Sequence, residues 1–369
     1  MSRSLLVLPE ATAQPLLAAI AGAQQTLRIK MFLFSDPGLL AAVIAAKKRG
    51  VDVKVMLNPA RRSGETENEE SRRKLVEAGV SVLDSNPAFD LTHEKSMVVD
   101  AREAYVMSLN WETRNVTETR DYAVITRHPG EVAEITACFD ADWHRKTFDP
   151  PAESPLIWCN TNGRERFAHF IDRAVHSLWL ENERYQDAVI IERVVRAARR
   201  GVKVHIVARP PHTLKKEKLI EGVGGLRIMA DVGCKVHKLK HIRLHGKMML
   251  ADSARAIVGS VNLAPGSFDA RRELAIEVED ADVVGPLEKV AKQDWDESKA
   301  LDLTDEGLFL DLAKRHKEAG AAELVLDVHE DAHAEKHGHA YARHTTGGDA
   351  GGKHAESGAT EHKHHGKHE

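Results

Sequence analysis

An internal repeat is the feature that most constrains how this chain can fold. Residues 93–110 read HEKSMVVDAREAYVMSLN, and residues 245–262 read HGKMMLADSARAIVGSVN. Aligned without a gap, the two copies match in these polar residues: His93 with His245, Lys95 with Lys247, Asp100 with Asp252, Ser108 with Ser260, Asn110 with Asn262, and further on Arg120 with Arg272 and Asp121 with Glu273. One shared residue type can arise by chance, but a whole constellation in one register predicts a duplicated structural unit.

The segments that precede each copy repeat as well. Residues 26–34, TLRIKMFLF, are typical of a buried strand, and LLAAVIAAKKRG has the apolar spacing of a helix that stops at Gly50. VDVKVML then alternates like a strand, so strand, helix and strand predict a parallel pair joined by a crossover helix. The second half repeats these elements as SLWLENERY, IIERVVRAARRG and VKVHIVA. We therefore expect an α/β fold of two homologous lobes, each a mixed β-sheet flanked by helices, related by a pseudo-twofold axis.

The repeat also predicts the domain limits. Residues 1–150 form the first lobe, residues 151–320 form the second lobe with closing helices, and residues 321–369 form a tail. The tail holds nearly half of the 21 histidines and few large apolar residues, which predicts disorder. It either chelates divalent metal outside the active site or serves as a flexible solubilising segment. In the second lobe, GVGG (residues 222–225) predicts a hinge or turn that interrupts a helix.

Bulk properties exclude several classes of protein. No window reaches the roughly 18 apolar residues of a membrane span, and the first residues are too short an apolar run for a secretory signal. The 3 cysteines are scattered, which fits neither a disulfide framework nor a zinc site and favours a reducing compartment. We predict a cytoplasmic protein. The net charge of −4 belongs to the tail, and the balanced body argues neither for nor against a nucleic-acid partner.

The repeated residues suit the chemistry of a phosphodiester. On a strand, His93 and Lys95 point the same way, and a turn brings Ser108 and Asn110 back on the next strand. Two such sets, facing one another, would form a cage of donors for the nonbridging oxygens of a phosphate. We predict a catalytic set of His93, Lys95, Asn110, Asp121, His245, Lys247, Asn262 and Glu273, with Ser108 and Ser260 as substrate ligands or turn caps.

Two histidines in opposite protonation states complete this chemistry. A neutral imidazole attacks phosphorus, and a protonated one donates to the leaving oxygen. Each ring needs an acceptor at its far nitrogen, a role that Asp121 and Glu273 are placed to fill unless they are ordinary exposed strand acids. Asp100 and Asp252 lie an odd number of residues from their histidines and face away, so we predict that they are structural and anchor a turn.

These residues resemble the signature of the phospholipase D superfamily: H-x-K, four residues, D, six residues, then G-S-x-N. The second copy fits throughout, with Gly259 in place, and the first copy has Met107 at the position of that glycine. The resemblance implies a two-lobed fold with one shared active site, a phosphohistidine intermediate, and no metal or other cofactor.

The resemblance favours a phosphodiesterase or phosphatidyltransferase acting on phospholipids, like cardiolipin synthase, with peripheral contact to a membrane. We assign His93 as nucleophile and His245 as acid and base. Two alternatives stay open: a nuclease that cleaves DNA or RNA with the same chemistry, and a catalytically silent phosphate-binding scaffold. The basic run from Lys235 to Arg243 is either a solvated face or a lip around an anionic substrate.

Overall fold

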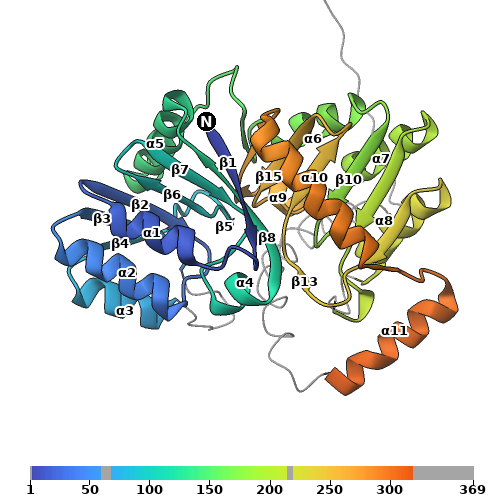
Figure 1. Ribbon diagram of the computed structural model, residues 1–369, viewed down its shortest axis with the longest axis horizontal. Helices are drawn as coiled ribbons and strands as arrows, with labels where there is room; N and C mark the ends of the chain where they lie inside the picture. The colour runs from blue at the N-terminus through green and yellow to red at the C-terminus, as the bar shows by residue number, and fades with distance from the viewer. Residues whose placement is uncertain (1, 60–67, 214–218, 319–369) are drawn as a thin grey trace, which may run out of the picture. The chain divides into compact units, whose positions relative to one another are not determined.

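The computed structural model describes residues 2–59, 68–213 and 219–318. Its main elements build two eight-stranded sheets with helices packed against them (Figure 1). The expected α/β class, with two homologous lobes of mixed sheet and flanking helices, is confirmed. The limits at residues 150 and 320 remain a prediction, and the predicted tail lies outside the described residues.

The first lobe starts at the N-terminus, and its strands run in the order β1-β8-β7-β6-β2-β3-β4. The eighth strand of this sheet, β13 (Arg243–Leu244), comes from the second half of the chain and pairs with β8. Its elements are β1 (Arg3–Leu8), α1 (Gln14–Gly22), β2 (Thr26–Met31), α2 (Pro37–Lys48), β3 (Asp52–Leu57), α3 (Glu69–Glu77), β4 (Ser81–Asp84), β5 (Leu91–Thr92), β6 (Ser96–Val99), β7 (Glu103–Met107), α4 (Thr113–Thr117), β8 (Thr119–Thr126) and α5 (Pro129–Trp143).

The second lobe repeats this plan, with strand order β18-β12-β11-β10-β14-β15-β17-β9. Its elements are β9 (Leu156–Trp158), α6 (Gly163–Asp172), β10 (Ser177–Glu181), α7 (Ala188–Arg199), β11 (Lys203–Val207), the 3₁₀ turn η1 (Pro211–Thr213), α8 (Leu219–Asp231), β12 (Lys235–Lys238), β13 (Arg243–Leu244), β14 (Met248–Ala251), β15 (Arg255–Gly259), α9 (Pro265–Asp269), β16 (Arg271–Arg272), β17 (Leu274–Val278), α10 (Ala281–Asp296), β18 (Lys299–Ala300) and α11 (Asp305–Glu318).

The crossover helices α2 and α7 show why both halves of the sequence fold alike. Asp36 caps α2 by accepting the N–H of Leu39 at 2.9 Å, and Asp187 caps α7 in the same way at the matched position. After each helix the chain turns through a glycine with φ of +95°, Gly50 and Gly201. The next strand then pairs in parallel with the strand before the helix, β3 with β2 and β11 with β10.

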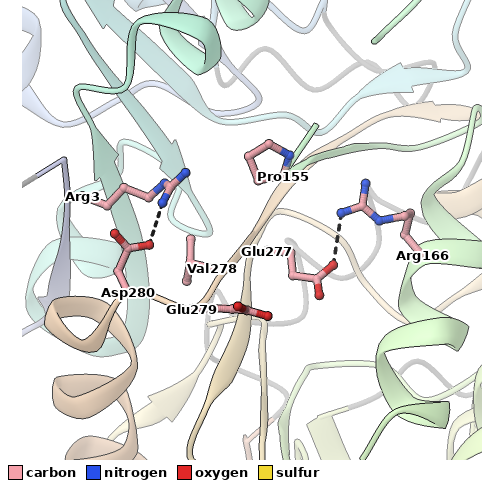
Figure 2. A pocket seen from close by; sticks show the side chains of 7 residues that line it. All are labelled: Arg3, Pro155, Arg166, Glu277, Val278, Glu279 and Asp280. Carbon is pink, nitrogen blue, oxygen red and sulfur yellow. Dashed lines mark hydrogen bonds and ion pairs between the residues drawn. The ribbon is translucent and has the colours of Figure 1, made fainter. Parts of the chain in front are cut away.

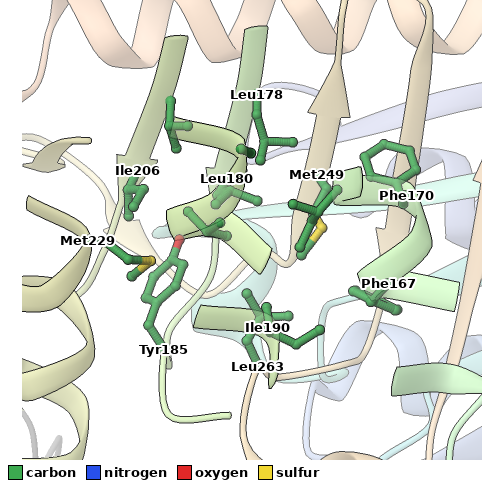
Figure 3. Packing of buried hydrophobic residues seen from close by; sticks show 14 of the residues in the cluster. Phe167, Phe170, Leu178, Leu180, Tyr185, Ile190, Ile206, Met229, Met249 and Leu263 are labelled. Atoms are coloured by element: carbon green, nitrogen blue, oxygen red, sulfur yellow. The ribbon is translucent and has the colours of Figure 1, made fainter. Parts of the chain in front are cut away.

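Three large apolar cores hold the sheets and helices together. One core fills each lobe, and Figure 3 shows that of the second lobe, where Leu180 of β10 and Met249 of β14 pack against Ile190 of α7 and Phe167 of α6. A third core lies between the lobes and combines Val106 and Val124 of the first sheet with Val258 and Ile276 of the second. Because the lobes share buried apolar surface, they pack as one body.

The prediction for the glycine-rich segment is wrong. Residues 222–225 lie inside one continuous helix, α8, and form no hinge. A Cβ built on Gly225 would lie only 2.3 Å from the carbonyl oxygen of Tyr185 and 2.7 Å from Ile191. The glycine therefore serves close packing of α8 against the loop after β10. None of the helices in the described part of the chain is long and apolar enough to cross a bilayer.

Candidate active site

Two very short strands bring the repeated motifs together. β5, directly before His93, pairs in parallel with β16 of the second lobe, and β13, directly before His245, pairs in parallel with β8 of the first lobe. The backbone N–H of His93 donates to the carbonyl of Arg272 at 2.9 Å, and that of His245 donates to Arg120 at 3.2 Å. Each motif histidine is thus fixed to the backbone of the residue directly before the acid of the other lobe, Arg272 before Glu273 and Arg120 before Asp121.

The motif acids hold the histidines across the lobes. Nδ1 of His93 lies 3.0 Å from Oε2 of Glu273 and 3.1 Å from the carbonyl oxygen of Ser260. Nδ1 of His245 lies 2.8 Å from Oδ1 of Asp121. With Nδ1 engaged, Nε2 is the nitrogen that each ring presents for chemistry. The sequence pointed to these acids but not to the exchange of partners between the lobes.

Both acids are fully buried and ionised. Burial would raise the pKa of Asp121, but the adjacent His245 and then Lys247 outweigh it and lower the pKa. Glu273 behaves in the same way, because His93 and then Lys95 lower its pKa against the effect of burial. The carboxylates therefore stay acceptors over the whole physiological pH range.

The motif serines lie against these acids. Oγ of Ser108 donates to Asp121 at 2.6 Å and accepts the N–H of Tyr122, and Oγ of Ser260 donates to Glu273 at 2.6 Å and accepts the N–H of Leu274. Both serines are fully buried. This placement supports a role in orienting the carboxylates. The sequence left substrate binding and turn capping open for these serines, and the substrate-ligand role stays a prediction.

The lysines and asparagines supply buried donors beside the rings. Nζ of Lys95 donates to the carbonyl of His93 at 2.7 Å, and Nζ of Lys247 donates to that of His245 at 2.5 Å. Asn110 and Asn262, which follow the motif serines, are buried too. Oδ1 of Asn110 has no hydrogen-bond partner among the described residues. Nδ2 of the same residue donates to Glu112 at 3.4 Å. The oxygen of this amide is therefore available to accept a hydrogen bond from a ligand.

The motif aspartates lie at the opposite ends of the strands. Asp100 accepts the backbone N–H groups of residues 24–26 at 2.7–2.9 Å, and Asp252 accepts those of residues 175–177. Both start a hairpin turn with positive φ. Burial alone would raise the pKa of each carboxyl. The backbone donors outweigh this effect, so the pKa of both aspartates is lower than usual. The aspartates thus anchor the turn and the start of β2 or β10.

The departure from the signature at Met107 is accommodated in the apolar core of the first lobe. Met107 is fully buried in the core of the first lobe. At the matched Gly259, a Cβ would lie 2.4 Å from the carbonyl oxygen of Leu274 and 2.4 Å from Cα of Ala275. The glycine in the second copy therefore allows β15 to pack closely on β17.

Sequence reasoning missed two residues that flank the rings, Glu183 and Phe32. Oε2 of Glu183, just after β10, lies 2.6 Å from Nζ of Lys247 and 3.9 Å from Nε2 of His245, while its Oε1 accepts from Arg209 at 3.2 Å. In the first lobe the matched position is Phe32 (Glu183 and Phe32 align in SLWLENERY and TLRIKMFLF). That alignment was the available signal, since it sets a charged residue against an aromatic one.

Buried ion pairs tie the lobes together on both sides of the site. Arg120 of the first lobe contacts Asp294 of α10 with two hydrogen bonds, at 2.6 and 2.8 Å. The matched Arg272 of the second lobe contacts Asp142 of α5 at 3.0 and 2.9 Å. Because these bidentate pairs repeat like the motifs, the lobes are joined symmetrically.

Within the part of the chain that the structure describes, one buried group has the side-chain types of a metal site: Glu94, Cys138 and Asp142. The ammonium of Lys30 lies among them, 2.8 Å from Glu94 and 2.7 Å from Asp142. The lysine thus fills the place that a cation would take. This group serves as an ion-pair cluster.

A separate hollow of about 600 Å³ opens between β17 and the start of α10 (Figure 2). Its lining contains no motif residue. Arg3 donates to Asp280 at 2.6 Å and Arg166 donates to Glu277 at 3.1 Å, so both cations are engaged with acids. Glu279 adds further negative charge. The hollow is therefore unsuited to a phosphate.

Comparison with known proteins places the repeat in a family. The family model described as "Cardiolipin synthase, PLD-like domain" matches residues 16–143 and again residues 167–295. Cardiolipin synthase B of Escherichia coli strain K12 is 26% identical over 313 residues, which cover 71% of this chain and 72% of that protein. The human mitochondrial cardiolipin hydrolase is 30% identical over 151 residues, 39% of this chain and 58% of that protein.

Solved structures share the fold at low sequence identity. The phosphatidylserine synthase of Haemophilus influenzae Rd KW20 has a TM-score of 0.65 and 11% identity, and the match covers 89% of this chain and 95% of that one. The polyphosphate kinase of Porphyromonas gingivalis has a TM-score of 0.64 and 15% identity, with 86% of this chain and 53% of that one covered. The likeness to both concerns the architecture alone.

Proposed function

Since the chain belongs to the phospholipase D-like family and carries two copies of its domain, we propose that it is a phosphodiesterase or phosphatidyltransferase acting on phospholipids. The observation that carries the proposal is the pair of imidazoles, each with Nδ1 on a buried carboxylate of the opposite lobe. Such a pair supplies one nucleophile and one acid for a single phosphorus atom. The site residues His93, Lys95, Asn110, His245, Lys247 and Asn262 carry the chemistry, and Asp121 and Glu273 orient it.

The reaction proceeds in two displacements. Nε2 of the neutral ring attacks phosphorus, the bond to the head-group oxygen breaks, and the other ring gives its proton to that oxygen. An alcohol or water then loses its proton to the same ring and attacks phosphorus, which breaks the bond to histidine. Lys95 and Lys247 stabilise the charge on the nonbridging oxygens in both steps.

Phospholipid is the preferred substrate because a relative named cardiolipin synthase B is matched over 72% of its own length. A substrate of this kind lies in a bilayer, so the protein must contact a membrane surface to reach it. The nuclease alternative predicts instead that DNA or RNA is cleaved. These substrate classes are separated by experiment.

The test compares vesicles containing phosphatidylglycerol with plasmid and single-stranded DNA. We expect glycerol release from the vesicles and intact DNA; cardiolipin as the lipid product indicates transfer, and phosphatidic acid indicates hydrolysis. His93→Asn and His245→Asn should each lower turnover by about 10,000-fold, while His128→Asn, a change of an exposed histidine, should not. Mass spectrometry of the quenched enzyme should show a phosphatidyl group on one motif histidine.

Cleavage of DNA with intact vesicles would replace the lipid assignment by the nuclease. Wild-type turnover in both motif-histidine variants would end the catalytic assignment altogether. EDTA should leave the rate unchanged, since the chemistry proposed here is carried by side chains.

A further inference from the structure

The last helix of the second lobe, α11, exposes two large apolar side chains. Phe309 and Leu310 are 73% and 64% exposed, and they are the only adjacent pair among the large apolar residues that are exposed in the described part of the chain. The helix stands at the edge of the second lobe, apart from both sheets (Figure 1). Neighbouring apolar side chains of this size indicate a surface that binds a partner.

Contacts with the body of the protein fix the orientation of α11. Asp311 is buried and accepts hydrogen bonds from the backbone N–H of His212 at 3.0 Å and from Nζ of Lys238 at 3.3 Å. At the start of the helix, Asp305 pairs with Arg227 of α8 at 2.6 Å. Because Asp311 is held inward, the apolar pair stays on the outward face of the helix.

The basic run from Lys235 to Arg243 joins this helix to the active site. Lys238 ends β12 in contact with α11, and the chain reaches His245 within the next seven residues. Between these two points, Lys240 and Arg243 are exposed. One part of the run thus holds α11, and the rest stays exposed on the segment that leads to His245.

We propose that α11 and residues 239–243 form a docking surface for a bilayer of anionic phospholipid. This inference rests on the proposed function and deepens it, because it names the surface through which the site reaches a lipid substrate. Phe309 and Leu310 enter the boundary between head groups and acyl chains, and Lys240 and Arg243 lie at the level of the lipid phosphates. Apolar side chains beside basic ones are what a peripheral membrane surface requires.

A bilayer fits this surface better than a nucleic acid or a second copy of the chain. A nucleic acid would engage the basic residues through its phosphates but would leave Leu310 in water. A second copy bound through α11 would cover the apolar pair, but it would bring two basic segments together. A negatively charged leaflet satisfies both the apolar and the positive part of the surface.

The experiment measures sedimentation of the full chain with phosphatidylcholine vesicles that contain or lack phosphatidylglycerol. We expect binding that requires phosphatidylglycerol and weakens with added salt. Phe309→Ser combined with Leu310→Ser should lower the partition constant by at least about 10-fold, and Lys240→Glu should lower it by about 10- to 30-fold. Glu306→Gln removes an exposed acid from the first turn of α11, and it should raise the partition constant by about 5-fold.

Two matched variants and a soluble probe make the test specific. Val175→Ser changes another apolar residue that is 64% exposed, beside the turn of Asp252 at the far end of the strands. Lys235→Glu changes the first residue of the same basic run, at the start of β12. Both should bind vesicles like wild type. The docking variants should turn over vesicle lipid more slowly, in step with binding, but should release nitrophenolate from water-soluble bis(p-nitrophenyl) phosphate at the wild-type rate, which shows that they are folded.

Vesicle binding that is absent in wild type, or that survives the changes in α11 and at Lys240, would overturn the docking surface while the proposed function stands. If wild type docks through α11 but turns over no lipid, the docking surface stands and the proposed function fails. Binding of DNA that depends on Lys240 but not on Leu310 would assign the surface to nucleic acid. A dimer in solution that Phe309→Ser dissociates would assign α11 to a second copy, and either result overturns docking on lipid.

Discussion

The two lobes surround their cross-lobe arginines with opposite charge. In the first lobe, Lys30 of β2 reaches Asp142, the partner of Arg272, so two cations serve that acid. At the matched position of the second lobe, β10 has Glu181 beside the pair of Arg120 and Asp294. Burial raises the pKa of both Asp142 and Asp294, but only for Asp142 do the neighbouring cations outweigh it and lower the pKa.

This difference shows how a duplicated fold keeps its shape while its halves diverge in protonation. The caps of α2 and α7, the aspartates that anchor the hairpins and the arginine pairs are the same in both lobes. The differences in charge lie at the ends of β2 and β10. There Lys30 aligns with Glu181, and Phe32 aligns with Glu183. Electrostatics at these ends, more than backbone geometry, distinguishes the half-sites.

The largest expected loss of activity that tests the difference between the half-sites comes from the two acids that hold the rings of His93 and His245. Asp121→Asn and Glu273→Gln should each lower kcat by about 100- to 1,000-fold, because Nδ1 loses its anionic acceptor. If the rings have distinct roles, Glu273→Gln should slow the burst of nitrophenolate, whereas Asp121→Asn should slow turnover and leave the burst nearly intact. Stopped-flow kinetics on bis(p-nitrophenyl) phosphate separates the two.

Both variants should unfold near the wild-type temperature, which is the control for this comparison. Identical loss of burst and turnover in the two variants would show that the half-sites are interchangeable.

A second, intermediate effect concerns stability at the cross-lobe pairs. Arg120→Met and Arg272→Met should each lower the free energy of unfolding by about 3–5 kcal/mol at pH 8, since each leaves a buried acid without its bidentate partner. The Arg120 variant should regain stability at pH 5, because Asp294, whose pKa burial already raises, takes up a proton. Urea unfolding at both pH values measures this.

The Arg272 variant is the matched comparison. Lys30, which lies 2.7 Å from Asp142, remains when Arg272 is replaced, and its positive charge disfavours protonation of Asp142. Little stability should therefore return at pH 5. Equal recovery in the two variants would contradict the difference in charge between the lobes.

The repeat predicted much of this architecture because it preserved local signals. Apolar helix spacing, stop glycines and strand alternation lie within short windows, so the α/β lobes and the paired motifs could be predicted. The exchange of Asp121 and Glu273 between lobes could not be. It depends on β5 and β13, which are two residues long and carry no periodic pattern.

Other roles depend on contacts between distant parts of the chain. Gly225 is a turn signal by itself, but its role follows from the carbonyl of Tyr185, which a sequence does not place beside it. The hydrogen bonds that Ser108 and Ser260 donate to the buried carboxylates could not be read from the motif spacing. Glu183 lies outside the motif, and its closeness to His245 depends on where β10 ends relative to β14.

The smallest effect tests the charge of Glu181 directly. Burial, and next the negative charge of Asp294, raise the pKa of Glu181 to about 8. The folded protein therefore binds this proton more tightly than the unfolded chain. Its contribution to stability is fully present below the ordinary pKa of about 4.5 and is lost as the pH rises through about 8. The free energy of unfolding of the wild type should therefore fall as the pH rises from about 4.5 to about 8.

Glu181→Gln keeps an oxygen that can accept from the hydroxyl of Tyr122, which donates to Glu181 at 2.6 Å, and removes the titration. At pH 9 the variant should be more stable than wild type by about 1–3 kcal/mol, and at pH 5 the two should be nearly equal. Thermal unfolding of both proteins at the two pH values gives the difference, from which groups common to both cancel. Lys30→Met, at the matched position, should destabilise at both pH values, because it leaves Glu94 and Asp142 buried with one cation fewer. A stabilising effect of Glu181→Gln that is independent of pH would mean that packing, not charge, separates the two lobes at this position.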